Sequence, residues 1–147
     1  MNDVYIAKWN DSKWLTLSSF LFAIPSWFAY HNQLYSYSTL LLITSLVSAN
    51  YWRKATYSWR RNMDLIVARI SFCTFAITGA LYVRYIPYVI VGYIGFGVLI
   101  YSYHVSGALL KVNNHSWYRY HALFHVLLMF EQLLILDSIE KKVCVKS

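Results

Sequence analysis

Residues 88–104 read YVIVGYIGFGVLIYSYH, a run that contains no Asp, Glu, Lys or Arg. A helix that crosses the hydrocarbon core of a bilayer needs about 20 mostly apolar residues, with a range that begins near 17. The run therefore predicts a membrane-spanning helix. Its three glycines, Gly92, Gly95 and Gly97, are small enough to let a neighbouring helix approach closely.

Four further stretches share this apolar character, and they cover about residues 14–30, 34–51, 63–85 and 117–136. Each run is continuous, whereas a lipid-facing β-strand would alternate apolar and polar residues with a period of two. We therefore expect an all-α fold, a polytopic transmembrane helical bundle of about five spanning helices. It would form a single integral membrane domain over residues 1–147, with a short charged tail at 137–147.

The two prolines mark where these helices bend or stop. Pro25 lies inside the first stretch and predicts a kink there. Pro87 breaks the chain between the third and fourth stretches, because proline cannot continue helical hydrogen bonding. The first two stretches are the shortest and the richest in Ser, so a re-entrant or tilted arrangement of them is an alternative to full crossing.

The composition agrees with a membrane location. Apolar residues make up 59% and charged residues 13% of the 147, against roughly 45–50% and about 25% in soluble globular proteins. The net charge is +7, but the basic residues stand in short clusters, whereas nucleic-acid binding needs a continuous basic face. The expected partners are membrane lipids, a second copy of the chain or other membrane proteins, and not nucleic acid.

The basic residues between the apolar runs predict the orientation. With five spans, the N-terminus, the second loop and the fourth loop share one side, which carries eight Lys and Arg against four on the other. Because cytosolic loops carry an excess of Lys and Arg, we expect a cytosolic N-terminus and a non-cytosolic C-terminus. The short loop WRKATYSWRR, residues 52–61, contributes most to this count.

Several polar side chains interrupt the apolar runs near the same side of the membrane. Ionisable groups in spanning segments are costly and usually face the bundle interior, so each is a candidate site. His121 and His125 are four residues apart on one face of the last helix, a spacing suited to zinc, and His104 is the nearest spare ligand. Asp64, at the start of the third helix, could act as the catalytic group that positions a metal-bound water.

A structural interpretation of the same residues is the alternative. The His pair would then hydrogen-bond across helices near the headgroups, and Asp64 would pair with the arginines one turn before it. Arg69 lies at the depth of the His pair and would oppose a divalent metal. We therefore assign Arg69, Ser48 and Asn50 to a structural polar network. On this interpretation no cofactor is bound. On the metal-site interpretation, the His pair would hold zinc.

The order of these residues resembles that in the CREST group of membrane hydrolases, which includes ceramidases and the progestin and adiponectin receptors. That group has seven helices, with Ser-x3-His late in the second, Asp early in the third and a zinc-binding His-x3-His in the last. Here the last helix carries His121-Ala-Leu-Phe-His125, and the third opens with Asp64. The second helix ends with Ser48-Ala-Asn-Tyr-Trp52.

The resemblance implies a zinc-dependent hydrolase of lipid amides built on His121, His125 and Asp64. Two departures stand against full activity: the chain is two helices shorter, and Trp52 stands where the group has its other metal-binding His. The loss of that His implies a degenerate member that keeps the scaffold without the hydrolysis.

Three classes of function therefore remain. The first is a multi-pass membrane protein without evident catalytic machinery, which acts by packing, self-association or contact with other membrane proteins. The second is the CREST-like zinc hydrolase. The third is a small transporter or channel, in which Arg69 and Glu131 would line a polar path. The sequence contains no glycine-rich phosphate loop, nucleophile elbow or HExxH motif, and this favours the first class.

Overall fold

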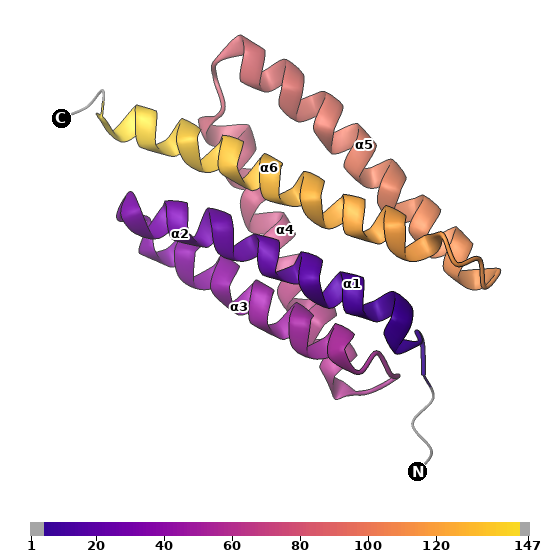
Figure 1. The fold of residues 1–147 in the computed structure, drawn as a ribbon. Helices are drawn as coiled ribbons and strands as arrows, with labels where there is room; N and C mark the ends of the chain where they lie inside the picture. Colours follow the sequence, from indigo (N-terminus) through magenta and orange to yellow (C-terminus); the bar gives the residue numbers. More distant parts are fainter. Residues whose placement is uncertain (1–4, 145–147) are drawn as a thin grey trace.

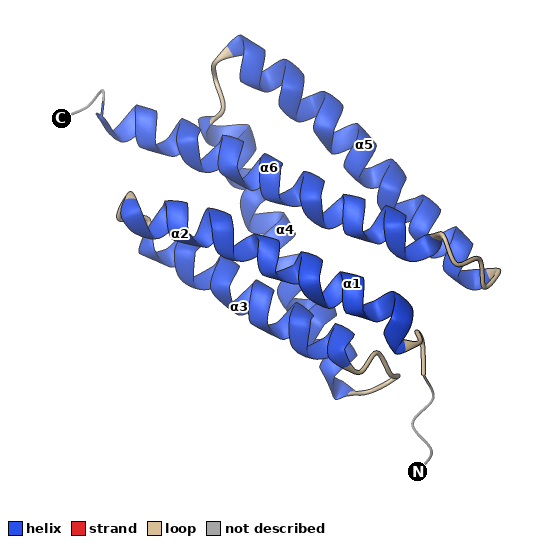
Figure 2. Cartoon of the chain, viewed as in Figure 1, coloured by secondary structure: helices blue, strands red, loops and turns tan. Residues whose placement is uncertain are grey.

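A computed structural model describes residues 5–144, and almost all of this part of the chain is helical (Figure 2). The elements are α1 (Trp9–Ser19), the 3-10 turn η1 (Phe20–Phe22), α2 (Ala23–His31), α3 (Tyr35–Arg53), α4 (Trp59–Tyr82), α5 (Ile86–Lys111) and α6 (Trp117–Cys144). No strand occurs within residues 5–144, which hold only an isolated bridge between Tyr5 and Thr56. The predicted all-α fold is confirmed.

The first helical rod is interrupted near its middle. The elements α1, η1 and α2 follow one another without a loop, and the 3-10 turn lies just before Pro25. Proline has no N–H to donate to the carbonyl one turn earlier, and its ring crowds that carbonyl. That carbonyl belongs to Leu21, in the centre of the turn. The proline therefore accounts for the break where the sequence predicts a kink.

The five rods, counting α1–η1–α2 as one, run alternately up and down (Figure 1). In Figure 1, α6 lies between α5 and the rod formed by α1 and α2. It packs against α1, α2, α4 and α5, whereas α5 packs mainly on α6. Helix α3 packs on the first rod and on α4. The bundle therefore has an inner group of helices and one outlying helix, α5.

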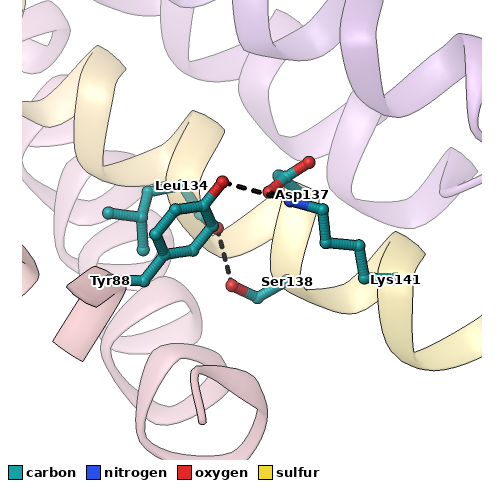
Figure 3. A network of polar contacts seen from close by, with 5 residues as sticks. All are labelled: Tyr88, Leu134, Asp137, Ser138 and Lys141. Atoms are coloured by element: carbon teal, nitrogen blue, oxygen red, sulfur yellow. Dashed lines mark hydrogen bonds and ion pairs between the residues drawn. The ribbon is translucent and has the colours of Figure 1, made fainter. Parts of the chain in front are cut away.

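Helix α6 is longer than the sequence predicts. The expected tail at 137–147 continues the helix to Cys144, and residues 145–147 lie outside the described residues. Lys141 donates to the Asp137 carboxylate at 2.6 Å, an i,i+4 pair that supports the last turns. The same ammonium group donates to the Tyr88 hydroxyl at 3.1 Å (Figure 3). Leu136 and Ile139 are buried on the inner face of this segment. Charge pairing and burial together therefore keep it helical.

Three helices, α4, α5 and α6, are long and apolar enough to cross a membrane. The expectation of about five such spans is supported only for these three. The first rod is divided by η1 into two pieces of 11 and 9 residues. Helix α3 has 19 residues, but Ser, Thr, Tyr and Asn are interspersed among its aliphatic residues and lower its hydropathy.

Three segments that the sequence places on one side of the membrane meet at one end of the bundle. The backbone N–H of Ile6 donates to the carbonyl of Ala55 at 2.8 Å. His115, in the loop between α5 and α6, lies 3.5 Å from the Asp11 carboxylate. A buried cluster that includes Trp52 and Trp117 fills this end. The N-terminal segment and the loops before α4 and α6 are therefore neighbours.

Candidate functional site

Buried serines line the contact between the first rod and α3. The Ser19 hydroxyl donates to the Leu15 carbonyl at 2.7 Å and lies 3.0 Å from the Ser48 hydroxyl. The Ser45 hydroxyl donates to the Ser19 carbonyl at 2.9 Å. Small hydroxyl side chains let two backbones approach closely and satisfy one another inside the bundle. This contact is the first half of the candidate site.

Asp64 lies beside this serine cluster. The Ser48 hydroxyl is placed to donate a hydrogen bond to the Asp64 carboxyl group. Asp64 comes five residues after the start of α4, and its side chain is partly buried. The structure therefore brings Asp64 and Ser48 together, as the sequence predicts for residues near the same end of α3 and α4.

The two histidines of α6 form the second half of the site. Their ring centroids are 5.0 Å apart, and His125 is 4% exposed. The Ser18 hydroxyl donates to the Leu15 carbonyl at 3.1 Å, and its oxygen lies 2.8 Å from Nδ1 of His125. The Nδ1–H tautomer of His125 can therefore donate to Ser18. Ser18 and Ser19 are adjacent in α1, so one turn of this helix joins the histidines to the Ser48–Asp64 pair.

Residues of two other helices enclose His121. Its Nδ1 lies 3.3 Å from the Ser106 hydroxyl of α5. The ring of Trp52, from the end of α3, lies edge-on to the imidazole with the centroids 5.0 Å apart. Trp52 is 5% exposed, and its indole N–H has no acceptor among residues 5–144. A bulky aromatic ring therefore occupies the space beside the His pair.

The structure does not bring the remaining candidates into this network. His104 is exposed on α5 and contacts the ring of Tyr103 at 6.0 Å. Asn50 is exposed at the end of α3, and Arg69 is exposed on α4. Arg69 has no hydrogen bond or ion pair within the described part of the chain. Each of these side chains points away from the interior that the sequence assigns to it, because each helix turns another face to its neighbours.

The donor set limits what the site can do chemically. Serine hydroxyls engage Nδ1 of both histidines, which leaves Nε2 of each ring to bind a metal or a proton. A structural or catalytic zinc site needs three or four protein ligands. Over residues 5–144, no group of three His, Cys, Asp or Glu side chains is close enough to hold a metal ion. The arrangement is well suited to joining helices through hydrogen bonds.

Sequence reasoning missed the residues of the first rod. Ser18 and Ser19 of this rod contribute to most of the hydrogen bonds of the network, with Ser45 of α3 donating to the Ser19 carbonyl, and Ser106 adds one from α5. A signal exists in the sequence, since Ser12, Ser19 and Ser26 recur every seven residues and all three are buried. That spacing places small residues on one helix face, which favours close packing.

Comparison with known proteins finds no family model, no curated protein and no solved structure that matches this chain.

Proposed function

We propose that this chain is a multi-pass integral membrane protein without a catalytic role, whose function is to associate with itself or with other membrane proteins. The observation that carries the proposal is the outward apolar surface of α4 and α5. Most side chains of these two long helices are exposed, including Ile77, Tyr93 and Ile94 at 61%, 76% and 64%. Such surfaces suit lipid or another helix.

In this proposal all five rods cross the bilayer, and the N-terminus is cytosolic. Four exposed loop positions test it, each replaced by Cys in a Cys73→Ser, Cys144→Ser background: Gln33, Tyr57, Tyr85 and Val112. A membrane-impermeant maleimide applied to sealed vesicles of known sidedness should label Tyr57→Cys and Val112→Cys from the cytosolic face. The other two should be labelled from the opposite face.

Each failure of the labelling pattern has its own meaning. If Gln33→Cys is labelled from the same face as Val112→Cys, the first rod does not cross, and the number of spans is wrong. If all four positions are labelled from the face opposite to the expected one, the orientation is wrong. The role in association is tested separately by cross-linking in two samples. One is the purified protein in lipid nanodiscs, and the other is the protein in its native membranes.

A degenerate CREST-like scaffold is the second candidate, and the place of Trp52 favours it. The ring that stands at the family's metal-ligand position in the sequence also lies beside His121. We expect substoichiometric zinc in the purified protein, and about one zinc per chain in a Trp52→His variant, because three histidines would then be available. Trp117→His is the matched control, since Trp117 is also buried near His121, with centroids 6.5 Å apart.

The zinc measurement separates the two candidates. One tightly held zinc in the unmodified chain, lost in His121→Ala or His125→Ala, would contradict the non-catalytic proposal and favour the hydrolase. No zinc in Trp52→His, or equal zinc in both tryptophan variants, would contradict the CREST-like scaffold.

A further inference from the structure

A small recess opens between α4 and α5, over the middle of α6. Its volume is about 50 Å³. The walls are aliphatic and aromatic, with Phe72 and Phe75 from α4 and Phe96 from α5. Two neighbouring residues of α6, Glu131 and Gln132, are the exceptions. Neither residue takes part in the contacts that His121 and His125 make with the serines and Trp52.

Glycines of α5 make room for the Glu131 carboxyl group. A Cβ atom at Gly95 would collide with Oε1 of Glu131, and one at Gly92 would lie 3.5 Å from Oε2. The carboxyl group therefore rests against the α5 backbone, where a larger residue would displace it. This close approach accounts for two of the four glycines of α5.

Gln132 presents a second acceptor to the recess. The residue is 3% exposed, and its Oε1 atom has no hydrogen-bond donor among residues 5–144. A buried amide oxygen without a donor is costly, typically by about 1–3 kcal/mol. The recess thus contains an acceptor that a bound donor would satisfy.

The depth of the recess makes the carboxyl group unusual. Glu131 comes 14 residues after Trp117, or about 21 Å along the helix. The hydrocarbon core of a bilayer is about 30 Å thick. No Lys or Arg forms an ion pair with Glu131 within the described residues. Acidic groups at such depths are rare and mark sites of binding or transport.

The chemistry of these walls specifies the ligand. A carboxyl group and a free amide oxygen both accept hydrogen bonds, and aromatic rings attract cations. We propose that the recess binds a primary ammonium group carried on an apolar chain, that is, a lipophilic amine. Glu131 pairs with the ammonium charge, Gln132 Oε1 accepts one N–H, and the chain extends into the lipid between α4 and α5. A group the size of a water molecule, about 30 Å³, fits the volume.

Thermal unfolding of the purified full chain in detergent tests the proposal, because a ligand that binds the folded state raises the unfolding temperature. The probes are dodecylammonium, dodecanol and dodecyltrimethylammonium. Dodecylammonium should stabilise the protein. The neutral alcohol lacks the charge and the trimethyl analogue lacks the N–H donors, so both should stabilise it far less. Native mass spectrometry should find one bound amine per chain.

Two variants and a control assign the binding to the recess. Glu131→Gln and Gln132→Leu should each bind dodecylammonium at least about tenfold more weakly, because each removes a hydrogen bond to the charged ligand. Glu140→Gln should bind it as the unmodified chain does, since Glu140 lies on the same helix but outside the recess. Gln132→Leu keeps the test intact if Glu131→Gln fails to fold.

Three results would overturn the proposal. Equal binding by the unmodified chain and by both variants would exclude the recess. Equal stabilisation by dodecanol would mean that only the apolar chain is bound. No binding of dodecylammonium by the unmodified chain would mean that the recess is not an amine site.

Discussion

The inner contact between α3 and the first rod differs from the outer surface of α4 and α5 in an instructive way. The inner helices are the less apolar ones, yet α3 buries seven residues, among them Thr44, Ser45 and Ser48. Helix α5 is strongly apolar, and only 11% of the residues in its most apolar stretch are buried within the protein. In a bilayer the lipid competes for apolar side chains, so small hydroxyl residues, rather than aliphatic ones, mark the protein interior.

The comparison predicts its largest effect at Ser19, which is 0% exposed. Ser19→Leu should destabilise the protein by about 3 kcal/mol, since overpacking costs about 1–3 kcal/mol and the lost hydrogen bonds add about 1 kcal/mol. Unfolding by denaturant in mixed micelles measures this. Ser36→Leu, at an exposed position of α3, is the control. Similar effects of both substitutions would mean that the inner contact is not tightly packed.

A second test compares a buried histidine of α6 with an exposed histidine of α5. His125→Ala should cost about 2 kcal/mol, because it leaves a cavity and removes the hydrogen bond to Ser18. His104→Ala, at an exposed site, should change the free energy of unfolding by less than about 0.5 kcal/mol. A large effect of His104→Ala alone would mean that the stabilising histidine lies on α5 and not on α6.

The glycines of α5 provide a finer test of the outer surface. Gly97→Ala meets nothing within 4 Å and should stabilise the helix by up to about 1 kcal/mol. Gly95→Ala must displace the Glu131 carboxyl group, so its gain should be smaller by a few tenths of a kcal/mol. The difference between their unfolding temperatures measures this contact. Equal gains would mean that Glu131 does not rest on Gly95.

The smallest expected effect is at Arg69. Because this side chain is exposed and lacks a partner among residues 5–144, Arg69→Leu should change the free energy of unfolding by less than about 0.5 kcal/mol. A loss comparable to that of His125→Ala would restore the prediction from the sequence, in which Arg69 belongs to a buried polar network.

The sequence predicts the elements better than their orientation. Continuous apolar runs and two prolines are local signals, so the helices and the break near Pro25 follow from them. Which face of a helix points inward is set by its neighbours, and the few polar residues of α4 and α5 do not mark one inner face. Polar groups in apolar runs usually face the interior, which predicts Arg69 and His104 inside the bundle, whereas both are exposed. The Ser18–His125 contact joins residues 107 positions apart, and no local pattern indicates it.

The central place of α6 has a consequence for biogenesis. The four helices that it contacts, α1, α2, α4 and α5, all precede it in the chain. The main partner of α1, α2 and α4 is α3, which is also synthesised earlier, whereas the main partner of α5 is α6 itself. Until α6 is synthesised, Ser18 and Ser106 lack the histidines that they contact, and α5 lacks the helix on which it mainly packs. Helices α1 to α4 can therefore assemble through α3 first, and the packing of α6 against them is the step that joins α5 to the bundle.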